Sequence, residues 1–345
     1  MDSQTERREA GGGASVGGRA TATAAIADDM ADAGEWTDEE GALMRLAVAR
    51  DRQRRRSAEP NGRRGRTRRA RCAPAADDRD DVFVPSQACS ENEQAMLQAA
   101  LGTFYADNVI VDVVARVKGG KEANVYCCLA HPSTGLKLVA AKIYRPRAHR
   151  TMRNDAVYRE GRLMLDEEGK GIVRDARLKR AVARKTDFGR ELMTFSWIEH
   201  EVACLRSLFA AGADVPRPIG HAGSAVLMEY LGEINAPAPV LAGVRLASVA
   251  EAHRLLERLL WHVELLLRLD RVHGDLSAYN VLYWDGRAVV IDFPQAVVAW
   301  SNPNAEWLLH RDVERLCQYF ERYGIRTDGA AIAGDLWQRY QSARL

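Results

Sequence analysis

Cysteine is scarce in this sequence, and its spacing fits neither a disulfide framework nor a metal site. The 345 residues contain six cysteines with no CxxC pair, and two of them, Cys127 and Cys128, are adjacent. Adjacent cysteines fit poorly into a disulfide framework. The pattern therefore predicts reduced thiols, as expected in a cytoplasmic protein.

Long apolar runs are lacking as well. No stretch of about 18 consecutive apolar residues occurs, and the N-terminus has no apolar signal core. We therefore expect neither a membrane span nor secretion. The hydrophobic fraction of 47% is nevertheless that of a globular protein, and a chain of 345 residues can bury a sizeable core.

A large excess of one charge is also missing, because the net charge is only +2. The segment Arg50–Arg71 nevertheless holds 11 arginines against Asp51 and Glu59, so its local net charge is +9 and the rest of the chain carries −7. This arginine-rich segment lies within residues 1–90, whose glycine, alanine and charge runs predict a disordered tail.

Two interpretations of the arginine-rich segment stay open. It is either a solvated part of the tail, or it binds RNA, a ribonucleoprotein or another polyanion. Clustered arginines favour the second interpretation because they release counterions from phosphate backbones.

The remaining pattern predicts an α+β, bilobal fold like that of protein kinases. β-branched runs predict a strand-rich N-lobe over residues 91–232, and leucines at helical spacing predict a mostly helical C-lobe over residues 233–345. A polar insertion, residues 145–196, carries 14 Lys or Arg against 8 Asp or Glu. The expected strands are 109–117, 124–129, 138–144, 225–230, 281–284 and 288–291, and the expected helices are 196–210, 248–269, 305–323 and 330–344.

Two features of the predicted N-lobe suit phosphate binding. The turn Lys118-Gly-Gly-Lys121 joins two expected strands, and its glycines let backbone N–H groups approach a phosphate, although a plain hairpin turn is the alternative. Lys142 lies in an apolar strand, where a buried ammonium needs a partner. Glu201, on the helix after the insertion, is the candidate partner. A lysine at the sheet edge and an exposed glutamate are the alternatives.

The most specific pattern runs from His273-Gly-Asp275 through Asn280 to Asp292. Asp285-Gly286, between two apolar runs, predicts a two-residue hairpin turn that places position 280 opposite position 291. Asn280 and Asp292 would then be neighbours, and an amide oxygen beside a carboxylate suits Mg²⁺. Asp275 would be free to orient or deprotonate a hydroxyl. The alternative is that all three are turn and strand-end residues.

At these positions the sequence resembles the RIO family of atypical serine/threonine protein kinases, over roughly residues 105–325. The resemblance implies a kinase-like fold that uses ATP and Mg²⁺. No long activation segment follows Asp292, which distinguishes the chain from ordinary protein kinases. The matching segments are Gly120-Lys-Glu-Ala-Asn-Val-Tyr126, Ala141-Lys142-Ile-Tyr144, Trp197 with Glu201, Val215-Pro-Arg-Pro-Ile219, Met228-Glu-Tyr-Leu-Gly232, Ile291-Asp-Phe-Pro-Gln295, and Asn302-Pro-Asn-Ala305 with Arg311-Asp312.

The resemblance also implies a role for each residue. Asp275 would accept the proton, while Asn280 and Asp292 would bind Mg²⁺. Asp292 would in addition accept phosphate in an aspartyl-phosphate intermediate. The implied ATP-binding residues are Gly119, Gly120, Lys121, Val125, Lys142, Glu201, Glu229 and Leu231.

Two departures from the family pattern are visible. The family usually has Ser-Thr before Gly120, whereas this chain has Lys118-Gly119, which removes a hydroxyl and adds a charge. Leu276-Ser277 resembles the branch without an N-terminal winged helix, whereas Asp292-Phe-Pro-Gln295 resembles the branch that has one. The tail does not resemble a winged helix, so the first branch is the closer of the two.

Three functions fit these residues. The first is a kinase that transfers the γ-phosphate of Mg-ATP to serine or threonine of a protein, itself included. The second is an ATPase switch on an RNA–protein particle, with phosphate carried by Asp292. The third is a small-molecule kinase of the aminoglycoside-phosphotransferase type, which the loop Gly120–Tyr126 and the segment Asp292–Gln295 disfavour.

Overall fold

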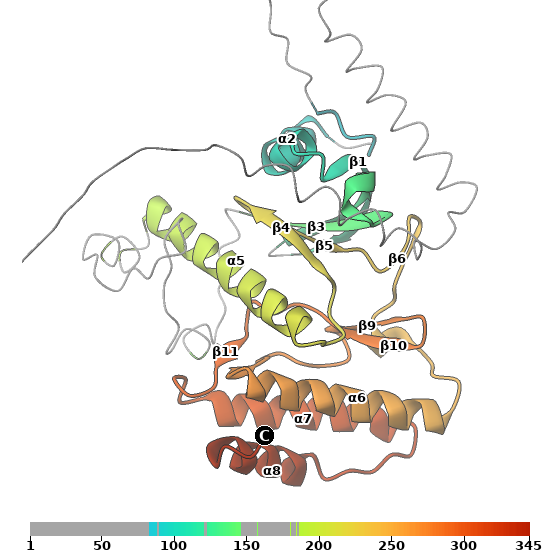
Figure 1. The fold of residues 1–345 in the computed structure, drawn as a ribbon, viewed down its shortest axis with the longest axis vertical. Helices are drawn as coiled ribbons and strands as arrows, with labels where there is room; N and C mark the ends of the chain where they lie inside the picture. The colour runs from blue at the N-terminus through green and yellow to red at the C-terminus, as the bar shows by residue number, and fades with distance from the viewer. Residues whose placement is uncertain are drawn as a thin grey trace, which may run out of the picture.

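The computed structural model describes residues 83–87, 90–120, 123–145 and 186–345, with the single residues 157, 180 and 184. The tail up to residue 82, its arginine-rich segment, Lys121 and most of the predicted insertion lie outside the described residues. Within the described part, a strand-rich lobe lies above a mostly helical lobe (Figure 1), so the predicted two-lobed α+β architecture is confirmed.

The N-lobe is built on an antiparallel five-stranded sheet with the order β1-β2-β3-β5-β4. Val125 lies opposite Lys142 and Cys127 lies opposite Ala140, so these four side chains share the face of the sheet that is turned to the C-lobe. The elements are β1 Ile110–Gly119, β2 Ala123–Ala130, the 3₁₀ turn η2 Pro132–Thr134, β3 Leu138–Tyr144, β4 Pro218–Ala222 and β5 Ala225–Glu229.

A helix that the sequence analysis did not predict, α2 (Glu91–Ala106), covers the other face of the sheet. Ser90 caps it by accepting a hydrogen bond from the backbone N–H of Glu93. Leu97, Leu101 and Phe104 are buried and pack in one cluster with Tyr126 of β2. Their spacing of three to four residues is helical, so this amphipathic signal was present in the sequence.

Phe83 belongs to the same N-lobe core, with only 5% of its surface exposed. Its carbonyl accepts a 2.7 Å hydrogen bond from Gln98 Nε2, and its ring centroid lies 4.8 Å from that of Tyr105. The folded region therefore begins before residue 90, where the predicted tail ended, because this one aromatic side chain completes the packing around α2.

The long helix α5 (Asp187–Ala210) connects the two lobes (Figure 1). Thr186 caps it by accepting a 3.0 Å hydrogen bond from Gly189 N, so the helix begins well before the predicted start at residue 196. Ile198 and Val202 pack against Tyr144 at the end of β3, while Leu205 belongs to the core of the C-lobe. The start was missed because the first turns contain a glycine, Gly189, and directly follow the charged insertion.

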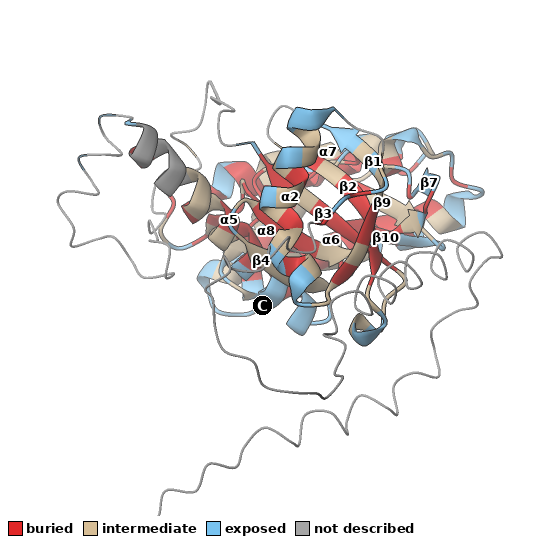
Figure 2. Ribbon diagram, turned by 90° about the horizontal axis from the view of Figure 1, so that it is seen from above, coloured by how far each residue is buried: buried red, intermediate tan, exposed pale blue. Residues whose placement is uncertain are grey.

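The C-lobe packs three helices beneath two short antiparallel strand pairs (Figure 1). Seen from above, buried residues fill the middle of the described structure and exposed ones lie toward its edges (Figure 2). After the sheet come β6 Gly232–Glu233, β7 Ala236–Pro237 and the 3₁₀ turn η4 Leu241–Gly243. The helices are α6 Val249–Arg268, α7 Ala305–Glu321 and α8 Gly329–Gln341, and the paired strands are β8 Arg271–Val272 with β11 Val297–Val298 and β9 Val281–Trp284 with β10 Arg287–Val290.

The β9–β10 hairpin has the predicted register. Asp285 and Gly286 form its turn, with positive φ angles of 51° and 71°, as a two-residue turn of this kind requires. Trp284 pairs with Arg287, and the backbone N–H of Ile291 donates a 3.0 Å hydrogen bond to Asn280 O. Position 280 therefore lies opposite position 291, as expected.

The described helices offer no candidate membrane span, because none of them is both long enough and apolar enough to cross a bilayer.

Replacing Phe83 by alanine tests the extended N-lobe core. We expect Phe83→Ala to lower the free energy of unfolding by about 3–5 kcal/mol, the usual cost of removing a buried phenylalanine ring. Val84→Ala is the matched control. Because Val84 is 48% exposed, its replacement should lower the free energy of unfolding far less. Urea unfolding followed by circular dichroism measures both variants. Equal effects would contradict the placement of Phe83 in the core.

Candidate active site

Lys142 joins the two lobes through two carboxylates. Its Nζ lies 2.6 Å from Glu201 Oε1 on α5 and 2.7 Å from Asp292 Oδ1, which follows the β9–β10 hairpin. Burial alone would lower the pKa of Lys142, but the carboxylates of Asp292 and Glu201 outweigh it and hold the pKa well above its usual range. The ammonium is therefore charged, and the predicted pairing of Lys142 with Glu201 is confirmed.

Tyr144 completes this ion pair, and the sequence analysis gave it no role in the site. Its hydroxyl donates a short hydrogen bond to Glu201 Oε2, the carboxylate oxygen that Lys142 does not use. Lys142 Nζ also lies 5.2 Å from the centroid of the Tyr144 ring. The sequence could have revealed the role of Tyr144. Lys142 and Tyr144 are two positions apart on one strand, which puts their side chains on the same face of the sheet.

The segment His273–Asn280 is called here the catalytic loop, and the buried side chain of His273 fixes its first residues. Its Nε2 lies 3.2 Å from Ile291 O, and its Nδ1 accepts a hydrogen bond from Asp275 N. Burial lowers the pKa of His273, so the ring is neutral and its single N–H points to the carbonyl. His273 is therefore suited to fixing the backbone and not to exchanging protons.

Within this loop, hydrogen bonds join Asp275 near its start to Asn280 at its end. The Asn280 Nδ2 group donates to the Asp275 backbone carbonyl at 2.8 Å and to Asp275 Oδ2 at 3.2 Å. The Asp275 side chain stays partly open to solvent, with 38% of its surface exposed. The loop thus presents a carboxylate that is oriented by an amide yet accessible to a reactant.

Asp292 has an unusual backbone conformation. Its φ is +73°, in the left-handed region that residues other than glycine seldom adopt. The next residue, Phe293, is buried with its ring centroid 5.0 Å from that of His273, which anchors the chain on the far side of Asp292. Backbone strain of this kind persists where the surroundings impose it and is concentrated at functional sites.

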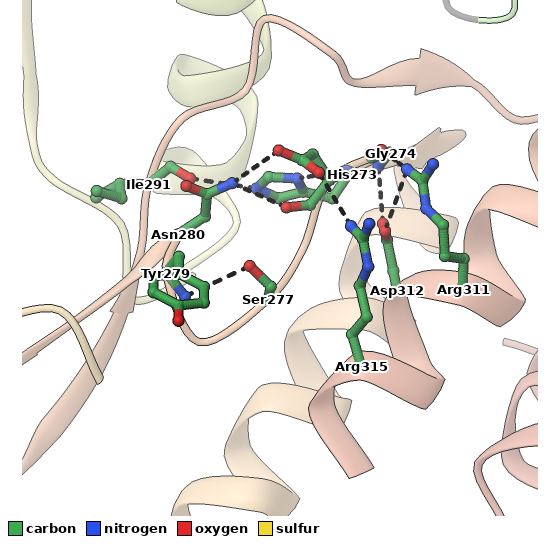
Figure 3. A network of polar contacts seen from close by, with 10 residues as sticks. His273, Gly274, Ser277, Tyr279, Asn280, Ile291, Arg311, Asp312 and Arg315 are labelled. Carbon is green, nitrogen blue, oxygen red and sulfur yellow. Dashed lines mark hydrogen bonds and ion pairs between the residues drawn. The ribbon is translucent and has the colours of Figure 1, made fainter. Parts of the chain in front are cut away.

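Helix α7 holds the catalytic loop from below through residues that the sequence analysis did not place in the site (Figure 3). Asp312, 1% exposed, accepts a 2.8 Å hydrogen bond from Gly274 N, and the Arg311 guanidinium donates to Gly274 O. Burial raises the pKa of Asp312 to about 7. Arg315, one turn further along, places Nη1 3.0 Å from Asp275 Oδ1.

The described ends of the predicted phosphate loop, between β1 and β2, lie close together. Gly120 N donates a 2.9 Å hydrogen bond to Ala123 O, and a Cβ at Gly120 would lie 2.8 Å from that same oxygen. Glycine is therefore required at position 120. At Gly119 a Cβ would collide with the guanidinium of Arg116, whereas Lys121 lies outside the described residues.

The segment Met228–Gly232, which resembles a kinase hinge, offers backbone groups to a ligand. The N–H and carboxylate of Glu229 are both engaged with Arg217, and Leu231 O accepts a hydrogen bond from Ala238 N at 3.0 Å. No described residue accepts a hydrogen bond from the N–H of Leu231. Met228 and Val125 pack against one cluster that includes Tyr230, so an apolar surface lies beside this segment.

Asn280 and Asp292 have the chemistry to hold the Mg²⁺ ion that the resemblance implies. Asn280 is anchored through Nδ2, and its Oδ1 accepts no hydrogen bond from the described residues. The Asp292 side chain is 43% exposed. The described ranges contain no group of three or more His, Cys, Asp or Glu side chains placed to hold a metal ion. A set of few oxygen donors suits Mg²⁺, which completes its shell with water and phosphate.

Comparison with known proteins identifies the family. A model of the RIO domain matches residues 156–331. The chain is 34% identical over 236 residues to the RIO-type serine/threonine-protein kinase Rio1 of Haloferax volcanii, a match that covers 68% of this chain and 72% of that relative.

Two eukaryotic relatives are similar over less of their length. Identity to the serine/threonine-protein kinase rio2 of Schizosaccharomyces pombe is 32%, covering 41% of this chain and 42% of the relative. Identity to human serine/threonine-protein kinase RIO1 is 27%, and this match covers 63% of this chain and 34% of the relative. The chain thus spans less than half the length of either protein.

Among solved structures, the crystal structure of the Rio2 kinase from Chaetomium thermophilum is similar with a TM-score of 0.48 and 22% sequence identity, over 71% of this chain and 68% of that one. The family assignment rests on the sequence matches and not on this structural likeness. On those matches, the chain belongs to the RIO family of atypical serine/threonine protein kinases.

Proposed function

We propose that this protein transfers the γ-phosphate of Mg-ATP to a serine or threonine hydroxyl of a protein, itself included. The observation that carries the proposal is the position of Lys142 between Glu201 and Asp292, at 2.6 and 2.7 Å. A buried ammonium held by one carboxylate from each lobe is suited to phosphate oxygens that enter between the lobes. The names of the relatives, all RIO-type kinases, support the same activity.

The nucleotide would lie across the face of the sheet that carries Val125 and Ala140. The free N–H of Leu231 and the carbonyl of Glu229 are suited to the edge of adenine. The backbone of Gly119 and Gly120 and the ammonium of Lys142 would then meet the phosphates. Glu201 and Tyr144 would act through Lys142 by fixing where its ammonium points.

The transfer step would use the catalytic loop. The acceptor hydroxyl oxygen forms a bond to the γ-phosphorus, and the bond from that phosphorus to the β–γ bridging oxygen breaks. Asp275 takes the hydroxyl proton, and ADP leaves with the electron pair. Mg²⁺, held by Asn280 and Asp292, would neutralise charge on the phosphate oxygens. Asn280 would also keep the Asp275 carboxylate oriented through its 3.2 Å hydrogen bond.

Replacing Asp275 by asparagine tests its role as the proton acceptor. The amide keeps the shape of the side chain but cannot take a proton, so phosphate transfer to protein should fall by about 10²–10⁴-fold. ATP affinity should stay within about threefold, because Asp275 holds no phosphate or metal in this arrangement. Transfer from labelled ATP and calorimetric titration with Mg-ATP measure the two quantities. A large loss of ATP affinity would instead assign Asp275 a structural role.

A second candidate function is an ATPase switch in which Asp292 itself receives the phosphate. Its backbone strain, at φ +73°, and its partly exposed carboxylate favour this possibility. An Asp292 oxygen would bond to the γ-phosphorus while the bond to the bridging oxygen breaks and ADP leaves. Water would then hydrolyse the acyl phosphate, which regenerates Asp292 and releases inorganic phosphate.

Asp292→Asn tests both roles of this carboxylate. We expect Mg²⁺-dependent nucleotide binding to weaken, since a ligand and a partner of Lys142 are lost together. Any protein-bound phosphate that alkali and hydroxylamine release should disappear. Gel separation of protein labelled from ATP, with and without hydroxylamine, measures the acyl phosphate. An unchanged hydroxylamine-sensitive label in Asp292→Asn would exclude Asp292 as the acceptor.

We also propose that the segment Arg50–Arg71 binds RNA, which would place the activity on an RNA–protein particle. Its local charge of +9 supports this, because each neutralised phosphate releases counterions. Deleting residues 1–80 should weaken RNA binding and flatten its dependence on salt, with ATP turnover unchanged. Deleting residues 1–49 is the control, since it leaves every arginine of the segment in place. Equal RNA affinity in both deletions would make the segment a solvated tail.

A further inference from the structure

The catalytic loop contains no cationic side chain. His273 Nδ1 accepts a hydrogen bond from Asp275 N, so that nitrogen carries no proton and the ring is neutral, and no lysine or arginine occurs between His273 and Asn280. A transferred phosphoryl group carries negative charge in the transition state, and a cation close to it is a recurring requirement of phosphate transfer. Among the described residues, the cation paired with Asp275 comes from outside the loop: it is the guanidinium of Arg315 on helix α7, with Nη1 3.0 Å from Asp275 Oδ1.

The charged groups of the site fall into two sets. Lys142 lies between Glu201 and Asp292, on the side where the β9–β10 hairpin meets the N-lobe. Arg315 lies at Asp275, on the side from which an acceptor hydroxyl would come. Each candidate catalytic carboxylate, Asp275 and Asp292, therefore already has its own cation, and the γ-phosphate would be transferred between the two.

Arg315 is held less tightly than its neighbour on α7. Arg311 is only 20% exposed, donates to Gly274 O and lies 4.9 Å from the ring of Trp307, so it has a fixed structural place. Arg315 is 40% exposed and its partner Asp275 is 38% exposed. An ion pair that is open to water on both sides is weak, so Arg315 can leave Asp275 for a more highly charged partner.

We propose that Arg315 is a catalytic residue that turns from Asp275 to the transferred phosphoryl group. This inference rests on the proposed kinase function and adds a residue to its active site. The planar guanidinium can donate two parallel hydrogen bonds to phosphoryl oxygens. As it leaves, Asp275 Oδ1 becomes free to take the proton of the acceptor hydroxyl. One movement therefore supplies the cation and uncovers the base, while the hydroxyl oxygen bonds to the γ-phosphorus and ADP departs.

Arg315→Ala is the direct test, with Arg322→Ala as the matched control. Arg322 ends the same helix and lies against the ring of Tyr319, so its loss removes the same charge away from the loop. We expect kcat to fall by about 10²–10³-fold in Arg315→Ala, the usual effect of removing one group that stabilises transition-state charge. The dissociation constant for Mg-ATP should stay within about threefold in both variants, and so should kcat in Arg322→Ala.

Added guanidinium separates direct contact from a positioning role. If Arg315 touches the phosphoryl group, free guanidinium ion should restore part of the rate to Arg315→Ala but not to Asp275→Asn, and Arg315→Lys should keep only part of the activity. Arg315→Ala should also lower the residual rate when combined with Asp275→Asn. No rescue together with no further loss in the double variant would show that Arg315 acts only by orienting Asp275, and would overturn the proposal.

The wild-type rate separates this inference from the function on which it rests. A wild-type protein that binds Mg-ATP but transfers no phosphate would refute the proposed kinase function, and the role of Arg315 with it. A wild-type protein that transfers phosphate while Arg315→Ala does so within about threefold of its rate would leave the kinase function intact and refute the role of Arg315 alone.

Discussion

The site depends on a single ammonium group that two carboxylates hold at the meeting point of the lobes. Lys142 comes from the sheet, Glu201 from α5 and Asp292 from the end of the hairpin, and the two ion pairs join residues 59 and 150 positions apart in the sequence. Because a buried charge without a partner is very unfavourable, Lys142 and Glu201 require each other, and the partly exposed Asp292 adds a second partner for the ammonium. The ion pairs that keep Lys142 charged therefore also join the two lobes.

Helix α7 has a comparable role on the other side of the site. Its residues Arg311 and Asp312 hold both backbone groups of Gly274, the carbonyl through the guanidinium and the N–H through the buried carboxylate. The loop between β8 and β9 therefore does not need internal rigidity to present Asp275 in a fixed place. A helix whose inner residues belong to the C-lobe core provides that rigidity instead, which links the geometry of the loop directly to the packing of the lobe.

What could be predicted from the sequence was one local turn and one long-range pairing that a buried charge requires. The hairpin register follows from the turn Asp285-Gly286, and the pairing of Lys142 with Glu201 follows from a lysine in an apolar strand that needed a carboxylate. Arg315 and Asp312 were missed as site residues because charged side chains on an amphipathic helix carry no signal of their own, and only tertiary packing brings α7 beneath the loop, next to partners 38 to 40 positions away. Helix α2 was missed for another reason. Its apolar stripe consists of only three buried residues, Leu97, Leu101 and Phe104, and it directly follows a low-complexity tail.

The two-residue turn of the β9–β10 hairpin has a consequence for which changes of length the protein can accept. Side chains alternate between faces along a strand, so one residue added at the turn would shift the pairing by one position and turn every later side chain to the opposite face. Asp292 would then point away from Lys142. An added residue in the connection between α7 and α8, residues 322–328, would leave the distances within the site unchanged. Insertions and deletions should therefore be excluded from the hairpin and accepted at that connection.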